Sequence, residues 1–184
     1  MRPRLLAHLA ARFARSLAPL APRRSDVEWA RSVLTSEEWA LWQTQPRKDL
    51  RESIAVARRA GAAFEGTVHA SETLWLAAAL LHDVGKRDAR LGTLSRSLAT
   101  IAGRLGGRKA VATWSAQRGL RRRVAIYLDH ADIGAAMLSV AGARPETAVW
   151  ARRHHSPETW DSLGVVPPLV AQVLASADGE DGGL

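Results

Sequence analysis

The side chains best suited to chemistry begin with His82 and Asp83, which come after the apolar run Leu74–Leu81 and precede Gly85 and Lys86. The apolar run predicts a buried helix, and a carboxylate beside it is costly unless it is paired or binds a metal. Imidazole offers a neutral nitrogen ligand, and a carboxylate offers oxygens that can bridge two cations. Because His-Asp is a common dipeptide, this pair indicates a metal site only if further ligands occur downstream.

More groups of this kind occur in the second half of the chain, namely His130, His154, His155 and Asp178. One such histidine is typically a satisfied core residue, but four histidines and two aspartates on successive helical segments indicate a site for one or two divalent cations. Two cations bridged by a carboxylate suit in-line attack at phosphorus, and Asp83 is the natural bridge. We expect iron or manganese, with zinc, cobalt and magnesium as alternatives.

Composition narrows the class of protein. The chain has 184 residues, enough for one domain with a real core, and 47% of them are hydrophobic. It has no Cys, which excludes disulfides and thiolate metal sites, so any metal must be held by His, Asp or Glu. No apolar run reaches the roughly 18 residues of a membrane span. We therefore expect a cytoplasmic protein, with peripheral membrane contact as an open alternative.

The formal charge of +8 is unevenly distributed. Residues 1–24 carry six Arg and residues 103–123 carry six Arg and one Lys, with no acid in either, so the rest of the chain carries −5, the difference between +8 and +13. Residues 1–24 also have the apolar spacing of a basic amphipathic helix. This helix could lie on an anionic membrane surface, act as a presequence or dock on the domain. No nucleic-acid recognition module is apparent.

The remaining pattern predicts an all-α fold. Helices are expected from Asp26, after Thr35 (where Glu38 completes a capping box), from Asp49, and over Glu72–Leu81 and Val124–Val140, the last with His130 at its middle. Pro145 and Pro167-Pro168 begin the last two helices. We divide the chain into the basic segment 1–24, a helical domain over 25–178 with a basic, glycine-punctuated insertion at about 87–123, and a flexible tail over 179–184.

The motif His82-Asp83 with Gly85-Lys86, followed by spaced His and a late Asp, resembles the HD-domain superfamily of metal-dependent phosphohydrolases. The resemblance covers about Thr35 to Asp178 and implies an HD-type helical bundle. The stretch His130–Gly134 and the pair His154-His155 are similar in outline to the HD-GYP branch, whose members often hydrolyse cyclic dinucleotides.

This resemblance implies roles for individual residues. One metal would be held by His82, Asp83 and Asp178, and a second by His130, His154 and His155, with Asp83 bridging. Lys86 would contact the substrate phosphate or assist the leaving oxygen, which makes it a catalytic candidate beside Asp83. Arg121, Arg122 and Arg123 either receive substrate phosphates or form a solvated basic turn.

The sequence departs from the family pattern at two places. Glu52 stands where the family usually has a His, before the run Ile54–Ala57, and is either a substitute metal ligand or a sign of a weakened first site. Gly164–Pro167 stands where the branch has Gly-Tyr-Pro, which weakens the case for cyclic di-GMP.

We therefore expect a metal-dependent hydrolase in which a metal-activated water attacks a phosphomonoester or phosphodiester. The substrate would be a phosphorylated small molecule, with a nucleotide as one candidate. The alternatives are a catalytically weak HD-type module that binds metal and nucleotide for signalling and, with less support, a di-iron oxygenase. The sequence does not set the oligomeric state.

Overall fold

The computed structural model describes residues 21–89, 114 and 118–179, and within this part of the chain every regular element is a helix. The expected all-α fold is therefore confirmed. Most of the basic segment 1–24, most of the insertion 87–123 and the tail beyond residue 179 lie outside the described residues. No single helix in the described ranges has the length and apolar composition of a membrane span; only α7 and α8 taken together, bent by 71°, meet that criterion.

Three helices begin the bundle, and their ends follow the local sequence. They are α2 (Arg24–Val33), α3 (Ser36–Trp42) and α4 (Arg47–Phe64). The predicted capping box is present at α3, where the Glu38 amide donates to the Thr35 hydroxyl and the Thr35 amide donates to the Glu38 carboxylate. Pro46 precedes α4, whose 18 residues make it the longest described helix.

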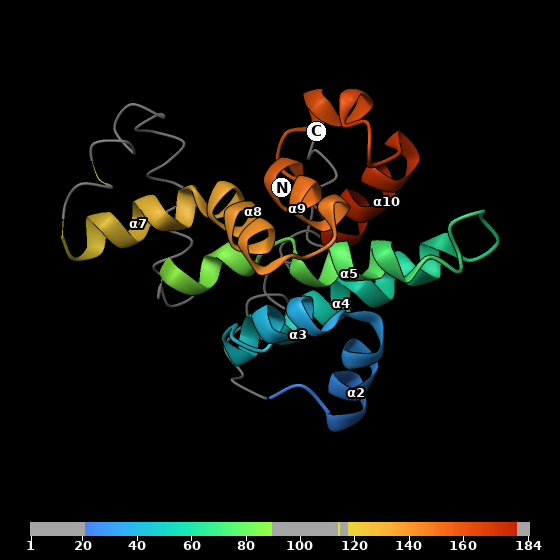
Figure 1. Cartoon of the computed structure of the whole chain (residues 1–184), viewed down its shortest axis with the longest axis horizontal. Helices are drawn as coiled ribbons and strands as arrows, with labels where there is room; N and C mark the ends of the chain where they lie inside the picture. Colours follow the sequence, from blue (N-terminus) through green and yellow to red (C-terminus); the bar gives the residue numbers. More distant parts are fainter. Residues whose placement is uncertain (1–20, 90–113, 115–117, 180–184) are drawn as a thin grey trace, which may run out of the picture.

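Helix α5 (Thr73–Leu81) lies at the centre of the bundle, between α4 and α9 (Figure 1). Six of its nine residues are buried, and α2 and α3 also contact it. A short helix that is apolar on all sides is stable only when other elements cover it. The 3-10 helix η1 (Val84–Ala89) follows directly, so the central helix delivers His82 and Asp83 into the interior.

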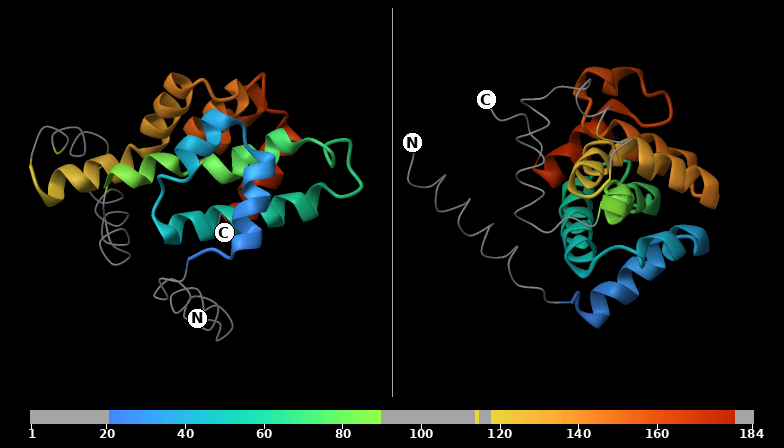
Figure 2. Two further views of the ribbon diagram at one scale, coloured as in Figure 1. Left: turned by 60° about the horizontal axis from the view of Figure 1, so that its bottom comes forward. Right: turned by 90° about the vertical axis from the view of Figure 1, so that its left-hand side faces the viewer.

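The expected single helix over 124–140 is wrong, because the structure has α7 (Leu120–Leu128) and α8 (His130–Ala141) with a break at Asp129. The Tyr127 carbonyl, which in a continuous helix would accept from residue 131, lies 2.6 Å from Nδ1 of His130 instead. His130 therefore begins α8 and does not lie in mid-helix. Figure 2 shows α7 extending away from the helices around α5.

Prolines begin the last two α-helices, as expected. Helix α9 (Pro145–Arg153) leads to His154 and His155, the 3-10 helix η2 (Pro157–Ser162) follows, and α10 (Pro168–Asp178) ends at the last aspartate of the predicted site. Because α10 packs on α4 and α5, Asp178 is brought back to the C-terminal end of the central helix.

Candidate metal centre

Five of the predicted site residues lie at helix ends that meet in the interior. His82 is the C-cap residue after α5 and Asp83 follows it, His130 begins α8, His154 is the C-cap residue after α9, and Asp178 is the last residue of α10. Ends of helices are where side chains can turn toward a common point without breaking the packing between helix faces. The site is thus assembled from four helices that are separated in sequence.

Three of the imidazoles are held by the same local contact. Nδ1 of His82 lies 2.8 Å from the Ala79 carbonyl, and Nδ1 of His154 lies 2.8 Å from that of Ala151. Nδ1 of His130 is placed likewise against a carbonyl three residues earlier. A carbonyl only accepts, so each Nδ1 carries the hydrogen and donates. In a neutral ring this arrangement leaves Nε2 with its lone pair, the tautomer that a metal-binding histidine needs.

The carboxylate of Asp83 lies at the centre of these nitrogens. Its Oδ1 is 3.2 Å from Nε2 of His130 and 3.6 Å from Nε2 of His154. Its Oδ2 is 3.4 Å from Nε2 of His82 and 2.5 Å from Nζ of Lys86. Lys86 is mostly buried, lies three residues further along η1, and has its ammonium 5.8 Å from the centre of the Tyr127 ring.

A divalent cation fits this arrangement, judged by what the buried atoms lack. Oδ1 of Asp83 and Nε2 of both His82 and His154 are buried without a hydrogen-bond partner among the described residues. Buried polar atoms are seldom left unpaired in native proteins, and here the orphaned atoms are a carboxylate oxygen and imidazole nitrogens that converge. In addition, the ligand atoms of Asp83, His130, His154 and His155 all lie within 4.8 Å of one another, and these four residues are called the converging set.

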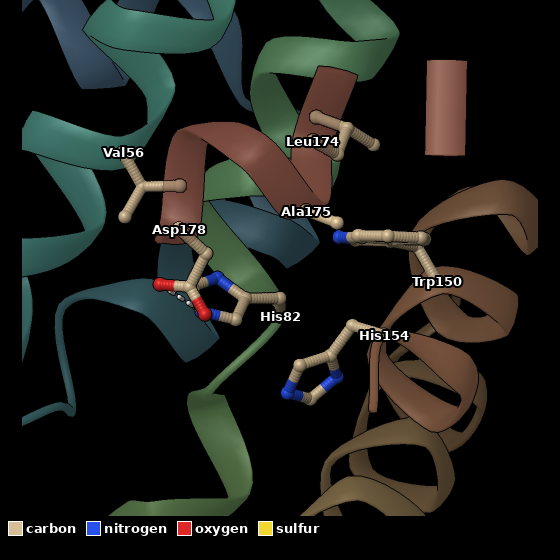
Figure 3. A pocket seen from close by; sticks show the side chains of 7 residues that line it. All are labelled: Val56, His82, Trp150, His154, Leu174, Ala175 and Asp178. Carbon is tan, nitrogen blue, oxygen red and sulfur yellow. Dashed lines mark ion pairs between the residues drawn. The ribbon is translucent and has the colours of Figure 1, made fainter. Parts of the chain in front are cut away.

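His155 and Asp178 complete the surroundings from opposite sides. Nε2 of His155, an exposed residue, is 3.1 Å from Nε2 of His130, and Oδ1 of Asp178 is 3.5 Å from Nε2 of His82. Figure 3 shows the Asp178 carboxylate against the His82 ring, with the His154 ring across a pocket that Trp150 also lines. His82 therefore lies between two carboxylates, and His130 lies between Asp83 and a second imidazole.

The electrostatics divide the histidines into two groups. Burial lowers the pKa of His82, but the charges of Asp83 and Asp178 outweigh it and hold that pKa well above its usual value. Burial also lowers the pKa of His130 and of His154, the latter to about 4, and there it prevails over the attraction of Asp83. His130 and His154 are therefore neutral bases near pH 7, as metal ligands must be.

The two carboxylates remain charged. Burial raises the pKa of Asp83, but the positive charges of Lys86 and His82 outweigh it and hold that pKa well below its usual value. Burial likewise raises the pKa of Asp178, but the charge of His82 outweighs burial and lowers that pKa to about 2. The centre therefore presents anionic oxygens and neutral nitrogens together, the donor set of iron, manganese or zinc.

The other predicted residues lie elsewhere. Glu52 is on α4 with its side chain 58% exposed, and its carboxylate is 3.8 Å from Arg59 of the same helix. It is not in the converging set, so its role as a ligand stays a prediction. Arg121, Arg122 and Arg123 are exposed in the first turn of α7, which packs on η1, and their role in substrate binding also stays a prediction.

Sequence reasoning missed two features that shape the centre. Tyr127 accepts from His130 through its carbonyl and faces Lys86 with its ring. Gly85 lies so close to α8 that a Cβ on it would be 2.1 Å from the His130 carbonyl oxygen. The break at Asp129, five residues before Gly134, could not be read from the apolar pattern. Gly85 and Gly134, one in each motif, were a usable signal of close approach.

Comparison with known proteins agrees with the geometry. The HD domain family model matches residues 50–182, which is more than half of the chain. A search of curated proteins and a search of solved structures gave no significant match. The chain belongs to the HD domain family. HD domains are typically metal-dependent hydrolases, and the match does not single out the HD-GYP branch.

Proposed function

We propose that this protein hydrolyses a phosphate ester, a monoester or a diester, in a reaction that depends on a divalent metal. The observation that carries the proposal is that Oδ1 of Asp83 and Nε2 of His154, both buried, lie close together without a hydrogen-bond partner among the described residues. When bound there, a divalent cation would lower the pKa of a water molecule and polarise a phosphoryl oxygen.

The chain supplies the rest of the chemistry. His130, His154 and His155 would hold the cation with Asp83, and His82 and Asp178 form the other side of the centre. Lys86 brings a fixed positive charge to the same carboxylate, where it offsets negative charge that develops on a phosphate. A phosphorylated small molecule, with nucleotides as the first candidates, is the substrate class that this charge pattern favours.

A metal- and nucleotide-binding module without turnover is the second candidate, because one observation favours it. Glu52, at the position where the family resemblance expects a histidine, points toward Arg59 at 3.8 Å and not into the converging set. If the side of the centre formed by His82 and Asp178 is incomplete, substrate could bind without being hydrolysed. Peripheral contact of residues 1–24 with an anionic membrane also remains a proposal.

The test measures hydrolysis of bis(p-nitrophenyl) phosphate, p-nitrophenyl phosphate and a nucleotide panel by the full-length protein with Mn²⁺, with Fe²⁺ and with EDTA. Asp83→Asn should lower the rate by at least about 100-fold, since even outer partners of metal ligands can cost that much. Asp88→Asn is the matched control, because Asp88 lies in the 3-10 helix that begins directly after Asp83 and pairs with its neighbour Arg87, away from the converging set.

Each outcome separates the candidates. Metal-dependent product release that is lost in Asp83→Asn and kept in Asp88→Asn supports the hydrolase. Nucleotide binding with metal but without product supports the binding module. Oxygen consumption by the iron-loaded protein, with no phosphate-ester hydrolysis, would replace both by the oxygenase alternative.

A further inference from the structure

The two oxygens of the Asp83 carboxylate face different surroundings. Oδ1 faces Nε2 of His130 and of His154 at 3.2 and 3.6 Å and has no hydrogen-bond partner in the described part of the chain. Oδ2 faces His82 at 3.4 Å and the Lys86 ammonium at 2.5 Å. Within the described ranges, Oδ1 therefore faces only imidazole nitrogens, while Oδ2 already has an ammonium as its partner.

The Oδ1 side has a full set of protein ligands. Asp83, His130, His154 and His155 bring four ligand atoms within 4.8 Å of one another. His154 is 2% exposed, and its Nε2 points into this set with no hydrogen-bond partner among residues 21–89 and 118–179. Three imidazoles and one carboxylate are enough to hold a first-row divalent cation without further protein groups.

The Oδ2 side has fewer ligands and more positive charge. His82 and Asp178 are the groups that remain there, and neither belongs to the converging set. Lys86 is fixed against Oδ2 and is only 17% exposed, so water does little to screen its charge. A second cation bridged by Asp83 would have to approach a buried ammonium or displace it.

Arg59 accounts for the position of Glu52 near the Oδ2 side. Nε of Arg59 donates to the Ala177 carbonyl at 2.6 Å, directly before Asp178, and Nη2 of Arg59 lies 3.8 Å from Glu52. Arg59 thus holds Glu52, the residue in the place of the expected histidine, in a contact along α4. Arg59 is about half exposed, so solvent screens its charge, and its contact with the Ala177 carbonyl mainly ties the end of α10 to α4.

We propose that this chain holds one tightly bound divalent cation, on the Oδ1 side with His130, His154 and His155, and that the Lys86 ammonium takes the place of a second cation at Oδ2. This inference rests on the proposed metal-dependent function. It assigns the single cation to the side of His155 and not to the side of Asp178. Lys86 then excludes a second cation from Oδ2 and also offsets negative charge on the substrate phosphate.

The experiment counts Mn²⁺ on the full-length protein. Metal-free protein is titrated with Mn²⁺ by calorimetry, passed through a desalting column and analysed by elemental mass spectrometry. Electron paramagnetic resonance then distinguishes an isolated Mn²⁺ from a coupled pair. Wild type should hold one equivalent with an uncoupled spectrum. Lys86→Met should bind a second equivalent at least about 10-fold more tightly than wild type does. Arg87→Met is the control: it removes a neighbouring positive charge that pairs with Asp88 and not with Asp83, and it should behave as wild type.

Two near-isosteric variants locate the ion. His155→Gln should weaken binding of the single Mn²⁺ by about 10-fold or more, and His82→Gln should retain it. Circular dichroism checks that each variant is folded. Two coupled Mn²⁺ ions in wild type, an unchanged count in folded Lys86→Met, or loss in His82→Gln but not in His155→Gln would overturn this inference and leave the proposed function intact. No bound Mn²⁺, Fe²⁺ or Zn²⁺ in wild type would overturn both.

Discussion

Gly85 determines how closely η1 approaches α8, and through that distance where His130 lies. A Cβ on Gly85 would meet the His130 carbonyl oxygen at 2.1 Å and the Gly134 nitrogen at 2.7 Å. Both are backbone atoms, so a rotamer change cannot relieve the clash. Gly85→Ala should therefore push α8 away and lower Mn²⁺ affinity by about 10-fold or more, the cost of disturbing the support of a metal ligand.

The control for this prediction is Gly61→Ala in α4. A Cβ there would meet only Cδ2 of Leu76 among the described residues, at 3.4 Å, which is ordinary contact, and alanine is the better helix former by about 1 kcal/mol. Gly61→Ala should keep Mn²⁺ affinity and leave the free energy of unfolding equal or higher. Calorimetric titration and urea unfolding measure the two quantities. Unchanged metal affinity in Gly85→Ala would show that Gly85 does not position His130.

At the residue scale the converging groups were predictable, because His and Asp beside apolar helices have few other uses. Which of these groups faces which oxygen of Asp83 was not predictable. The sequence places His82, Lys86 and Asp83 within five residues, but only the structure shows that Lys86 takes one oxygen of Asp83 and leaves the other for His130. The contact of Arg59 with the Ala177 carbonyl was not predictable either, because it joins residues 118 positions apart.

At the element scale the predicted helices were largely confirmed, because capping residues and prolines mark their ends locally. The exception is the helix predicted over Val124–Val140. Its apolar stripe continues on both sides of Asp129. Periodicity alone cannot show that the His130 imidazole donates a hydrogen bond to the Tyr127 carbonyl. The break redirects α7 along η1, so that the arginines of its first turn extend from the same element that carries Tyr127.

This geometry distinguishes Arg123 from Arg122 in α7. Arg123 and Tyr127 are four residues apart and share a helix face, and Tyr127 lies beside Lys86. Arg122 is on a different face. Arg123→Ala should raise KM for a phosphate ester by about 10-fold with little change in kcat, whereas Arg122→Ala should change KM by less than about 3-fold. Steady-state kinetics decide this, and equal effects of the two substitutions would favour a solvated basic turn.

At the scale of the whole molecule, a buried ion pair joins the N-terminal helices to the loop before α9. Glu38 is fully buried, and Nη2 and Nε of Arg144 donate to its two carboxylate oxygens at 2.5 and 2.9 Å across 106 residues of sequence. The Thr35 and Arg144 amides donate to the same carboxylate, so all its main acceptor sites are used. Removing one partner of such a pair costs about 3–5 kcal/mol.

The pair also makes stability depend on pH in a defined direction. Burial raises the pKa of Glu38, but the hydrogen bonds from Arg144 and Thr35 and the charge of Arg144 outweigh it, so that the pKa lies below its usual 4.5. A carboxyl whose pKa is lower in the folded state stabilises the fold above the unfolded-state pKa, and this contribution is lost as pH falls through the folded-state value. The loss therefore begins near pH 4.5 and continues below it.

Glu38→Gln tests both statements, because it keeps the shape of the side chain and removes its charge. Urea unfolding followed by circular dichroism should show a loss of about 3–5 kcal/mol at pH 7 and a smaller difference from wild type at pH 3.5. Glu37→Gln is the control: it changes the neighbouring exposed carboxylate, in the first turn of the same helix, and should cost less than about 1 kcal/mol at either pH. A difference between Glu38→Gln and wild type that stays constant from pH 7 to 3.5 would mean that the charge of Glu38 does not hold these helices together.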